Sequence, residues 1–214
     1  MELTKRDCNI QMTLSRCKYC GQQGKLIVDG QEYLFATTDG LGQFFGRLIG
    51  IMSSFLGCCG NFDQQFLDRN EMIDNQDNGH LRLHGTMLWD CRGSYWQWHF
   101  VQDVDSCPSW REKNKLTLHV TEHLYGEKTD NRFTLCFPMK DFAYAVAKCA
   151  TEVIKREGFW GYYNFAEKCE DFNVRQFLYL KAYALGVSEE MGYSALKSAS
   201  TYIQDELELL MFDM

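Results

Sequence analysis

The chain has 214 residues, of which 45% are hydrophobic and 14% aromatic, and its formal net charge at pH 7 is −7. It contains only two prolines and no Ser/Gly/Pro-rich linker, which disfavours separate modules and predicts one compact domain over residues 1–214 with a substantial core. The negative charge disfavours nucleic acid and anionic membranes as partners and favours a basic protein.

The N-terminal residues MELTKRDCNIQ contain neither the apolar core nor the cleavage site of an export signal, so we expect a cytoplasmic protein. Its ten cysteines are therefore expected to be reduced rather than paired in disulfides. Cys136, Cys149 and Cys169 fall inside apolar patterns, which is typical of small core residues.

Cys17 and Cys20 have the C-x-x-C spacing that presents two sulfur atoms to one zinc ion. A tetrahedral site needs two more ligands, for which Cys8 and one of the two cysteines at 58–59 are the candidates. Zinc is thus the one cofactor that the sequence suggests, and unliganded cysteines are the alternative. A redox role is disfavoured because that motif is expected between a strand and a helix.

Residues 25–37 predict a hairpin that turns at Asp29-Gly30, and residues 41–56 predict a helix. This helix has a small residue at every fourth position, which we expect to let its backbone approach a neighbour closely. The apolar run is long enough to cross a membrane, but Arg47 and Gln43 lie inside it and favour a buried helix of a soluble protein.

Two stretches carry much of the negative charge. Residues 63–77 contain five acids and one arginine, and residues 188–214 contain six acids and one lysine. We expect these stretches to attract a basic partner, whereas a surface that only keeps the protein soluble is the alternative interpretation. The predicted binding residues are Asp68, Glu71, Asp74 and Asp77, together with Trp110 in a polar loop over residues 102–114.

Residues 81–101 predict a second hairpin, because apolar side chains occupy alternate positions on both of its arms. The register expected from its turn sets Gly85 opposite Trp98, where a missing side chain makes room for an indole. The same register sets His84 opposite His99 on the polar face.

Residues 116–120 and 133–137 alternate in the same way, with a turn expected over residues 126–131, and bring the total to about six strands. From residue 138 the apolar period changes to 3.6, which predicts helices over residues 139–157, 173–185 and 189–211. Strands within residues 25–137 followed by helices within residues 138–214 predict an α+β fold. We expect one antiparallel sheet of five to six strands with helices packed on one face.

All five histidines lie between residues 80 and 123. His84, His99 and either His119 or His123 are expected to gather on the polar face of adjacent strands, and three imidazoles are a ligand set of catalytic zinc. Exposed histidines without a role are the alternative. The chain contains no G-x-S-x-G, Walker, dinucleotide-binding or H-E-x-x-H motif, so no catalytic residue is assigned and a protein that is not an enzyme is favoured.

A resemblance is carried by the run that contains Trp89, Asp90, Gly93, Tyr95, Trp98 and Phe100, by the strand at 116–120 and by the strand–helix passage at 133–158. It resembles a group of uncharacterised bacterial cytosolic α+β proteins, whose acidic members resemble the immunity proteins encoded beside secreted polymorphic toxins. The resemblance covers about the middle third of the chain and implies no catalytic residues.

Our first hypothesis is therefore a cytosolic protein-binding module, immunity-like, that masks a basic partner with the acids at 63–77 or 189–213. One alternative is a zinc-dependent enzyme that uses His84, His99 and His119. The other is a structural zinc protein that uses Cys17, Cys20 and Cys8.

Overall fold

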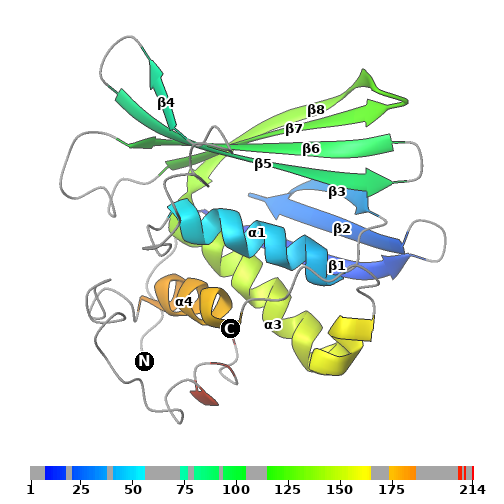
Figure 1. Cartoon of the computed structure of the whole chain (residues 1–214), viewed down its shortest axis with the longest axis vertical. Coiled ribbons are helices and arrows are strands. Elements are labelled where there is room, and N and C mark those ends of the chain that lie inside the picture. Colours follow the sequence, from blue (N-terminus) through cyan, green and yellow to red (C-terminus); the bar gives the residue numbers. More distant parts are fainter. Residues whose placement is uncertain are drawn as a thin grey trace.

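The computed structural model describes residues 8–17, 21–37, 41–55, 73–76, 80–91, 94–104, 115–164, 174–186, 207, 208, 210 and 214. The strands are β1 (Ile10–Cys17), β2 (Gly21–Val28), β3 (Gln31–Thr37), β4 (Ile73–Gln76), β5 (His80–Cys91), β6 (Ser94–Val104), β7 (Lys115–Leu124) and β8 (Glu127–Pro138). The helices are α1 (Leu41–Phe55), α3 (Met139–Asn164) and α4 (Val174–Leu185). Figure 1 shows the helices on one side of the strands.

The fold is α+β with antiparallel strands, as predicted, but the strands form two sheets instead of one. Their orders are β1-β2-β3 and β4-β5-β6-β7-β8. The predicted hairpin at 25–37 is present, and Asp29 and Gly30 both have positive φ angles in its turn. A strand that we had not predicted, β1, pairs with β2 and completes a separate three-stranded sheet. Its signal was the alternation of Ile10, Met12 and Leu14, all of which are buried.

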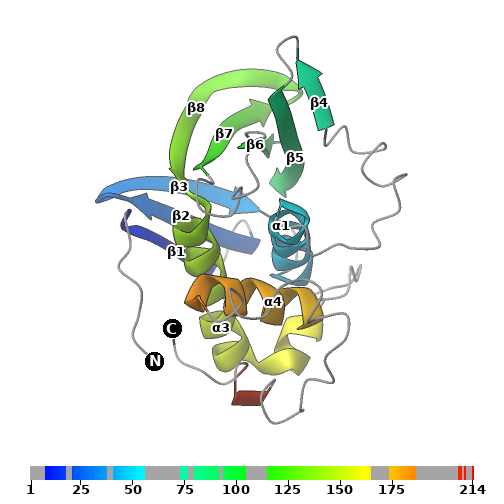
Figure 2. The same cartoon turned by 90° about the vertical axis from the view of Figure 1, so that its left-hand side faces the viewer.

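The inner face of the five-stranded sheet is covered by β3 as well as by helices, and not by helices only as predicted. The ring of Phe35 on β3 lies 4.8 Å from that of Trp98 on β6, measured between centroids. At one end of the sheet, Phe142 of α3 contacts Phe100 and Phe137, with centroids 5.9 and 4.8 Å apart. The three-stranded sheet therefore lies between the five-stranded sheet and part of the helical layer (Figures 1 and 2).

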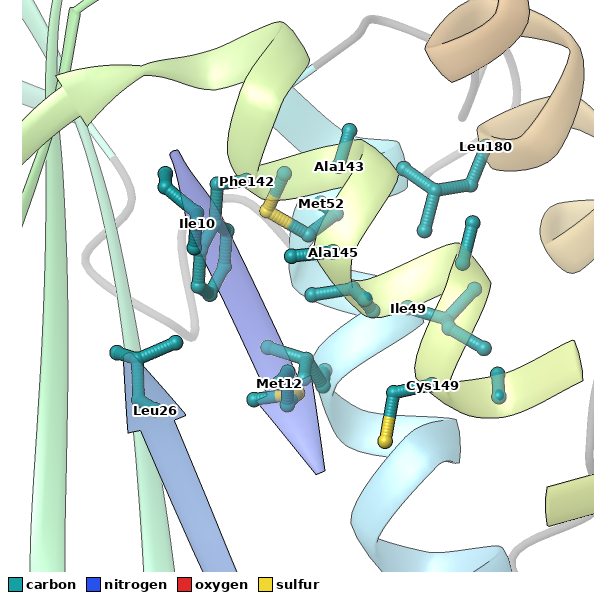
Figure 3. Close-up of a cluster of buried hydrophobic side chains, with 14 of the residues drawn as sticks. Ile10, Met12, Leu26, Ile49, Met52, Phe142, Ala143, Ala145, Cys149 and Leu180 are labelled. Carbon is teal, nitrogen blue, oxygen red and sulfur yellow. The ribbon is translucent and has the colours of Figure 1, made fainter. Parts of the chain in front are cut away.

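A second part of the core lies between β1 and the helices. Figure 3 shows the side chains that fill it, among them Ile10, Met12, Ile49, Met52, Phe142 and Cys149. Every residue of α3 from 142 to 147 is buried, which is typical of a helix surrounded by other elements. The exposed Cys136 contradicts the prediction of a core cysteine, whereas Cys149 is buried as predicted, and Cys169 lies outside the described residues.

The close approach expected from the small residues of α1 is absent at Gly50, and a close approach to this helix occurs at Gly85 of the sheet. A Cβ atom added at Gly50 would meet no atom within 4 Å, whereas one at Gly85 of β5 would lie 2.7 Å from Cγ2 of Ile51. Gly85 therefore makes room for α1 and not for Trp98. Arg47 of α1 donates a hydrogen bond from Nη1 to the carbonyl oxygen of Leu88, 2.9 Å away, and ties the helix to the same strand.

The register of the tryptophan hairpin differs by two residues from the prediction. Trp89 pairs with Trp96, Gly85 with Phe100, and His84 with Val101 rather than His99. A shift of two residues keeps each side chain on its expected face, because side chains alternate with a period of two. Accordingly, Trp89 and Trp98 are fully buried.

The turn between β7 and β8 is shorter than predicted, with positive φ angles at Tyr125 and Gly126. Residues 129–131, predicted to belong to the turn, instead form an irregularity within β8. Glu122 of β7 contacts this irregularity, because its Oε2 accepts hydrogen bonds from Thr129 Oγ1 at 3.2 Å and Asn131 Nδ2 at 2.6 Å. A side chain of the neighbouring strand thus replaces ladder bonds that the bulge removes.

Helices α1 and α4 end near their predicted limits, whereas α3 continues past its predicted end at residue 157 to Asn164. Gly158 interrupts α3 with φ 67°, and Gly186 follows α4 with φ 78° and bonds from its N to the carbonyl of Tyr183. Most of the helix expected over 189–211 lies outside the described residues. No described helix combines the length and the apolar character that crossing a membrane requires.

Candidate functional site

No described helix or strand covers the outer face of the five-stranded sheet, the face turned away from β3 and α1 (Figures 1 and 2). By alternation from the buried positions, the described side chains at its centre are Thr86, Leu88, Gln97, His99, Val101, Thr117, His119, Thr121, Thr134 and Cys136. None of these ten side chains carries a carboxylate, ammonium or guanidinium group. The charged side chains of Lys115 and Arg132 lie at the margins of this face.

Two of the predicted histidines meet on the outer face. His99 and His119 are Cα partners across β6 and β7, and their ring centroids lie 5.9 Å apart. His119 is exposed and His99 is half-buried. Nδ1 of His119 lies 2.9 Å from Oγ1 of Thr134 on β8, a contact that orients the imidazole. Sequence reasoning missed Thr134, because its place beside His119 depends on the register of β8.

Of the other two predicted histidines, His123 does not join this pair, and the side chain of His84 lies outside the described part of the structure. His84 pairs with Val101, two residues from its expected partner. His123 is only 5% exposed and stacks on Tyr95, with ring centroids 4.4 Å apart and Nδ1 3.0 Å from the phenol oxygen. Among the described residues, no group of three or more His, Cys, Asp or Glu side chains is placed to hold a metal ion. The structure therefore brings two of the predicted ligands together, His99 and His119, and the third ligand, His84, stays a prediction.

Two ligands of the predicted cysteine site, Cys8 and Cys17, lie near opposite ends of β1. Cys17 ends this strand opposite Gly21, while its side chain, Cys20 and residues 58–59 lie outside the described part. Cys8 precedes the other end of the strand. The strand separates Ile10 from Cys17 by about 23 Å at about 3.3 Å per residue, so Cys8 does not share one zinc ion with Cys17.

Cys8 instead lies between two carboxylates. Its Sγ is 3.6 Å from both carboxylate oxygens of Asp29, and its backbone N donates to Oδ2 of the buried Asp141 at 2.9 Å. Partial burial and the neighbouring charge of Asp29 raise the pKa of the Cys8 thiol to about 11. A thiol that stays protonated at neutral pH is a poor nucleophile and a poor metal ligand.

The acidic stretch at 63–77 leads into the edge of the five-stranded sheet. Its residue Asp74 lies on β4, which is an edge strand, and pairs with Arg82 of β5. The other predicted binding residues, Asp68, Glu71, Asp77 and Trp110, lie outside the described part of the chain. The chain therefore brings at least one of its predicted acids to the border of the open outer face.

Comparisons with models of protein families, with curated proteins and with solved structures gave no match. What the chain does is therefore inferred from its own residues.

Proposed function

We propose that this chain is a protein-binding module that holds a basic partner against the outer face and the β4 edge of its five-stranded sheet. The observation that carries the proposal is the depletion of charged groups at the centre of a sheet face that no described helix or strand covers. The centre of a protein interface is depleted in charged residues, whereas its rim is polar. The ten side chains of the outer face fit this pattern, with Lys115 and Arg132 at the margin.

The size of the face suits a partner of ordinary dimensions. Four strands that are about 4.8 Å apart and about ten residues long span roughly 600 Å². A standard interface buries about 800 Å² on each partner. The β4 edge at one end of the sheet and the turns at its opposite end would supply the rest. Leu124 and Tyr125, at the β7–β8 turn, offer apolar surface there, since they are 46% and 85% exposed.

The charge of the chain favours a basic partner. The net charge is −7, and residues 63–77 with their five acids run into β4 beside the outer face. Such an arrangement accelerates the encounter with a cationic protein more than it strengthens the final complex. Masking of a basic protein is also the immunity-like role that the sequence resemblance implies.

A photo-crosslinking amino acid at position 86 tests the proposed surface. We expect it to capture a protein from host-cell extract at low salt, and Thr134→Arg on the outer face should abolish that capture. The matched control places the crosslinker at position 13 and the arginine at Ser15, both exposed on the three-stranded sheet. Equal capture from positions 86 and 13, or capture that survives Thr134→Arg, would refute the outer face as the binding surface.

Charge neutralisation identifies which acidic stretch acts. Asp68→Asn, Glu71→Gln, Asp74→Asn and Asp77→Asn together remove four charges from the β4 side. Asp205→Asn, Glu206→Gln, Glu208→Gln and Asp213→Asn remove four from the C-terminal stretch. We expect only the first set to slow association with the captured protein and to flatten its dependence on salt. Equal effects of the two sets would mean that only the net charge of the chain matters, and not the position of the acids beside β4.

A further inference from the structure

We propose that His99 and His119 form a two-imidazole binding site for a divalent late transition metal ion, Ni²⁺, Cu²⁺ or Zn²⁺, on the outer face. The inference does not depend on the proposed protein partner. It also differs from the three-histidine zinc enzyme, because two ligands on an open sheet bind an ion without enclosing a substrate.

The distance between the two rings suits one shared ion. Metal–nitrogen bonds of about 2.0–2.1 Å place each ring centre about 3.2 Å from the ion, so two rings on neighbouring coordination positions have centres about 4.5–5.2 Å apart. The observed separation of His99 and His119 is 5.9 Å. The difference is about 1 Å, and we expect side-chain rotation on metal binding to close it, mainly at the exposed His119. The backbone already fixes both residues as direct partners across two strands.

Thr134 supplies the outer contact that such a site needs. When Nδ1–H of His119 donates to Oγ1 of Thr134, 2.9 Å away, the lone pair of Nε2 is left for the ion. Histidine ligands usually donate their second ring nitrogen in this way, and loss of the outer partner typically weakens metal binding about 10–100-fold. Thr134 is therefore a positioning residue of the site.

The row of side chains that contains the pair carries no positive charge, and the nearest described cation on this face, Arg132, lies in the next row, opposite Thr121. The side chains next to it in the same row of the sheet, Thr86 and Thr134, are uncharged and exposed. Imidazole nitrogen is a preferred ligand of copper, nickel and zinc, and divalent copper is expected to bind most tightly. Two protein ligands leave the remaining coordination positions to water.

A titration of the reduced full-length chain with NiCl₂ tests the site, followed by NMR of the imidazole ring nitrogens. We expect the His99 and His119 resonances to broaden first and in a saturable manner. His99→Asn and His119→Asn should each raise the Ni²⁺ concentration at half-maximal broadening by at least about tenfold. Thr134→Val should raise the same concentration by about tenfold. His80→Asn and Thr117→Val are the matched controls and should leave it unchanged.

A second variant separates loss of a ligand from loss of the fold. Thr86 is exposed and is the partner of His99 on β5, so Thr86→His in the His119→Asn background rebuilds a cross-strand pair on the other side of His99. We expect this double variant to recover Ni²⁺ binding. Broadening that is uniform over all histidines, or His99→Asn and His119→Asn variants that bind Ni²⁺ like the wild type, would overturn the proposal.

Discussion

Phe35 and Trp98 join the two sheets through an edge-to-face contact, with ring centroids 4.8 Å apart and an interplanar angle of 76°. The two residues lie on β3 and β6, which belong to different sheets. Gly24 of β2 makes the contact possible, because a Cβ atom there would lie 2.0 Å from the Phe35 ring. The sheets are therefore held together by packed faces and not by a shared hydrogen-bond ladder.

Phe35→Ala is expected to lower the free energy of unfolding by about 3–5 kcal/mol, since it removes a buried aromatic ring and leaves a cavity between the sheets. Urea denaturation measures the change. Leu34→Ala, on the same strand but 52% exposed, is the control and should change stability by less than about 0.5 kcal/mol. Similar losses in both variants would mean that this contact does not hold the sheets together.

Two glycine-to-alanine variants should change stability in opposite directions. Gly85→Ala is expected to destabilise the protein by about 1–3 kcal/mol, because the new methyl group would lie 2.7 Å from Ile51. Gly50→Ala meets no atom within 4 Å and should stabilise α1 by up to about 1 kcal/mol, through higher helix propensity. Thermal unfolding of both variants tests the pair. A stable Gly85→Ala variant would show that α1 does not press on β5 there.

Stability is expected to fall above about pH 9 because of Cys149. Burial raises the pKa of this thiol from 9.0 to about 12. The folded state therefore holds its proton more tightly than the unfolded state, so the stabilisation is complete below pH 9 and is lost as the pH rises toward 12. The loss approaches about 1.4 kcal/mol per pH unit. Urea denaturation at pH 8, 9 and 10 should show a smaller slope for Cys149→Ala, with Cys136→Ala as the control for removal of a thiol. Identical slopes in wild type and Cys149→Ala would refute the raised pKa.

Lys181 is expected to anchor the C-terminal residues. Its side chain is fully buried, and Nζ donates to the carbonyl oxygen of Leu210 at 3.1 Å. Lys181→Met keeps the apolar stem but removes the charged donor, which should cost about 1.5–3 kcal/mol locally. Limited proteolysis should then cleave within residues 207–214 faster than in the wild type. Lys155→Met, at an exposed position, serves as the control, and equal cleavage rates in the two variants would contradict the anchoring role.

For the histidine site, the sequence predicted which face of the sheet each residue occupies, but not which residues are neighbours across the strands. The alternation around His99 and His119 was enough to place both on the polar side, and the structure confirms that they meet. The third histidine could not be placed, because the register of β5 was expected two residues away from where it lies. The pairing of Cys91 with Ser94 leaves only two residues between β5 and β6, and this short connection sets the register.

The sequence by itself determined the features that depend only on residues close together in the chain. The alternation of apolar residues with a period of two places Trp98 on the buried face of its strand. The backbone freedom of glycine allows the turn at Gly30, the interruption of α3 at Gly158 and the end of α4 at Gly186. Only the tertiary structure decided that the strands divide into two sheets and that Thr134 lies beside His119. These features depend on which distant segments pack together, and a local pattern carries no information about the partner that covers it.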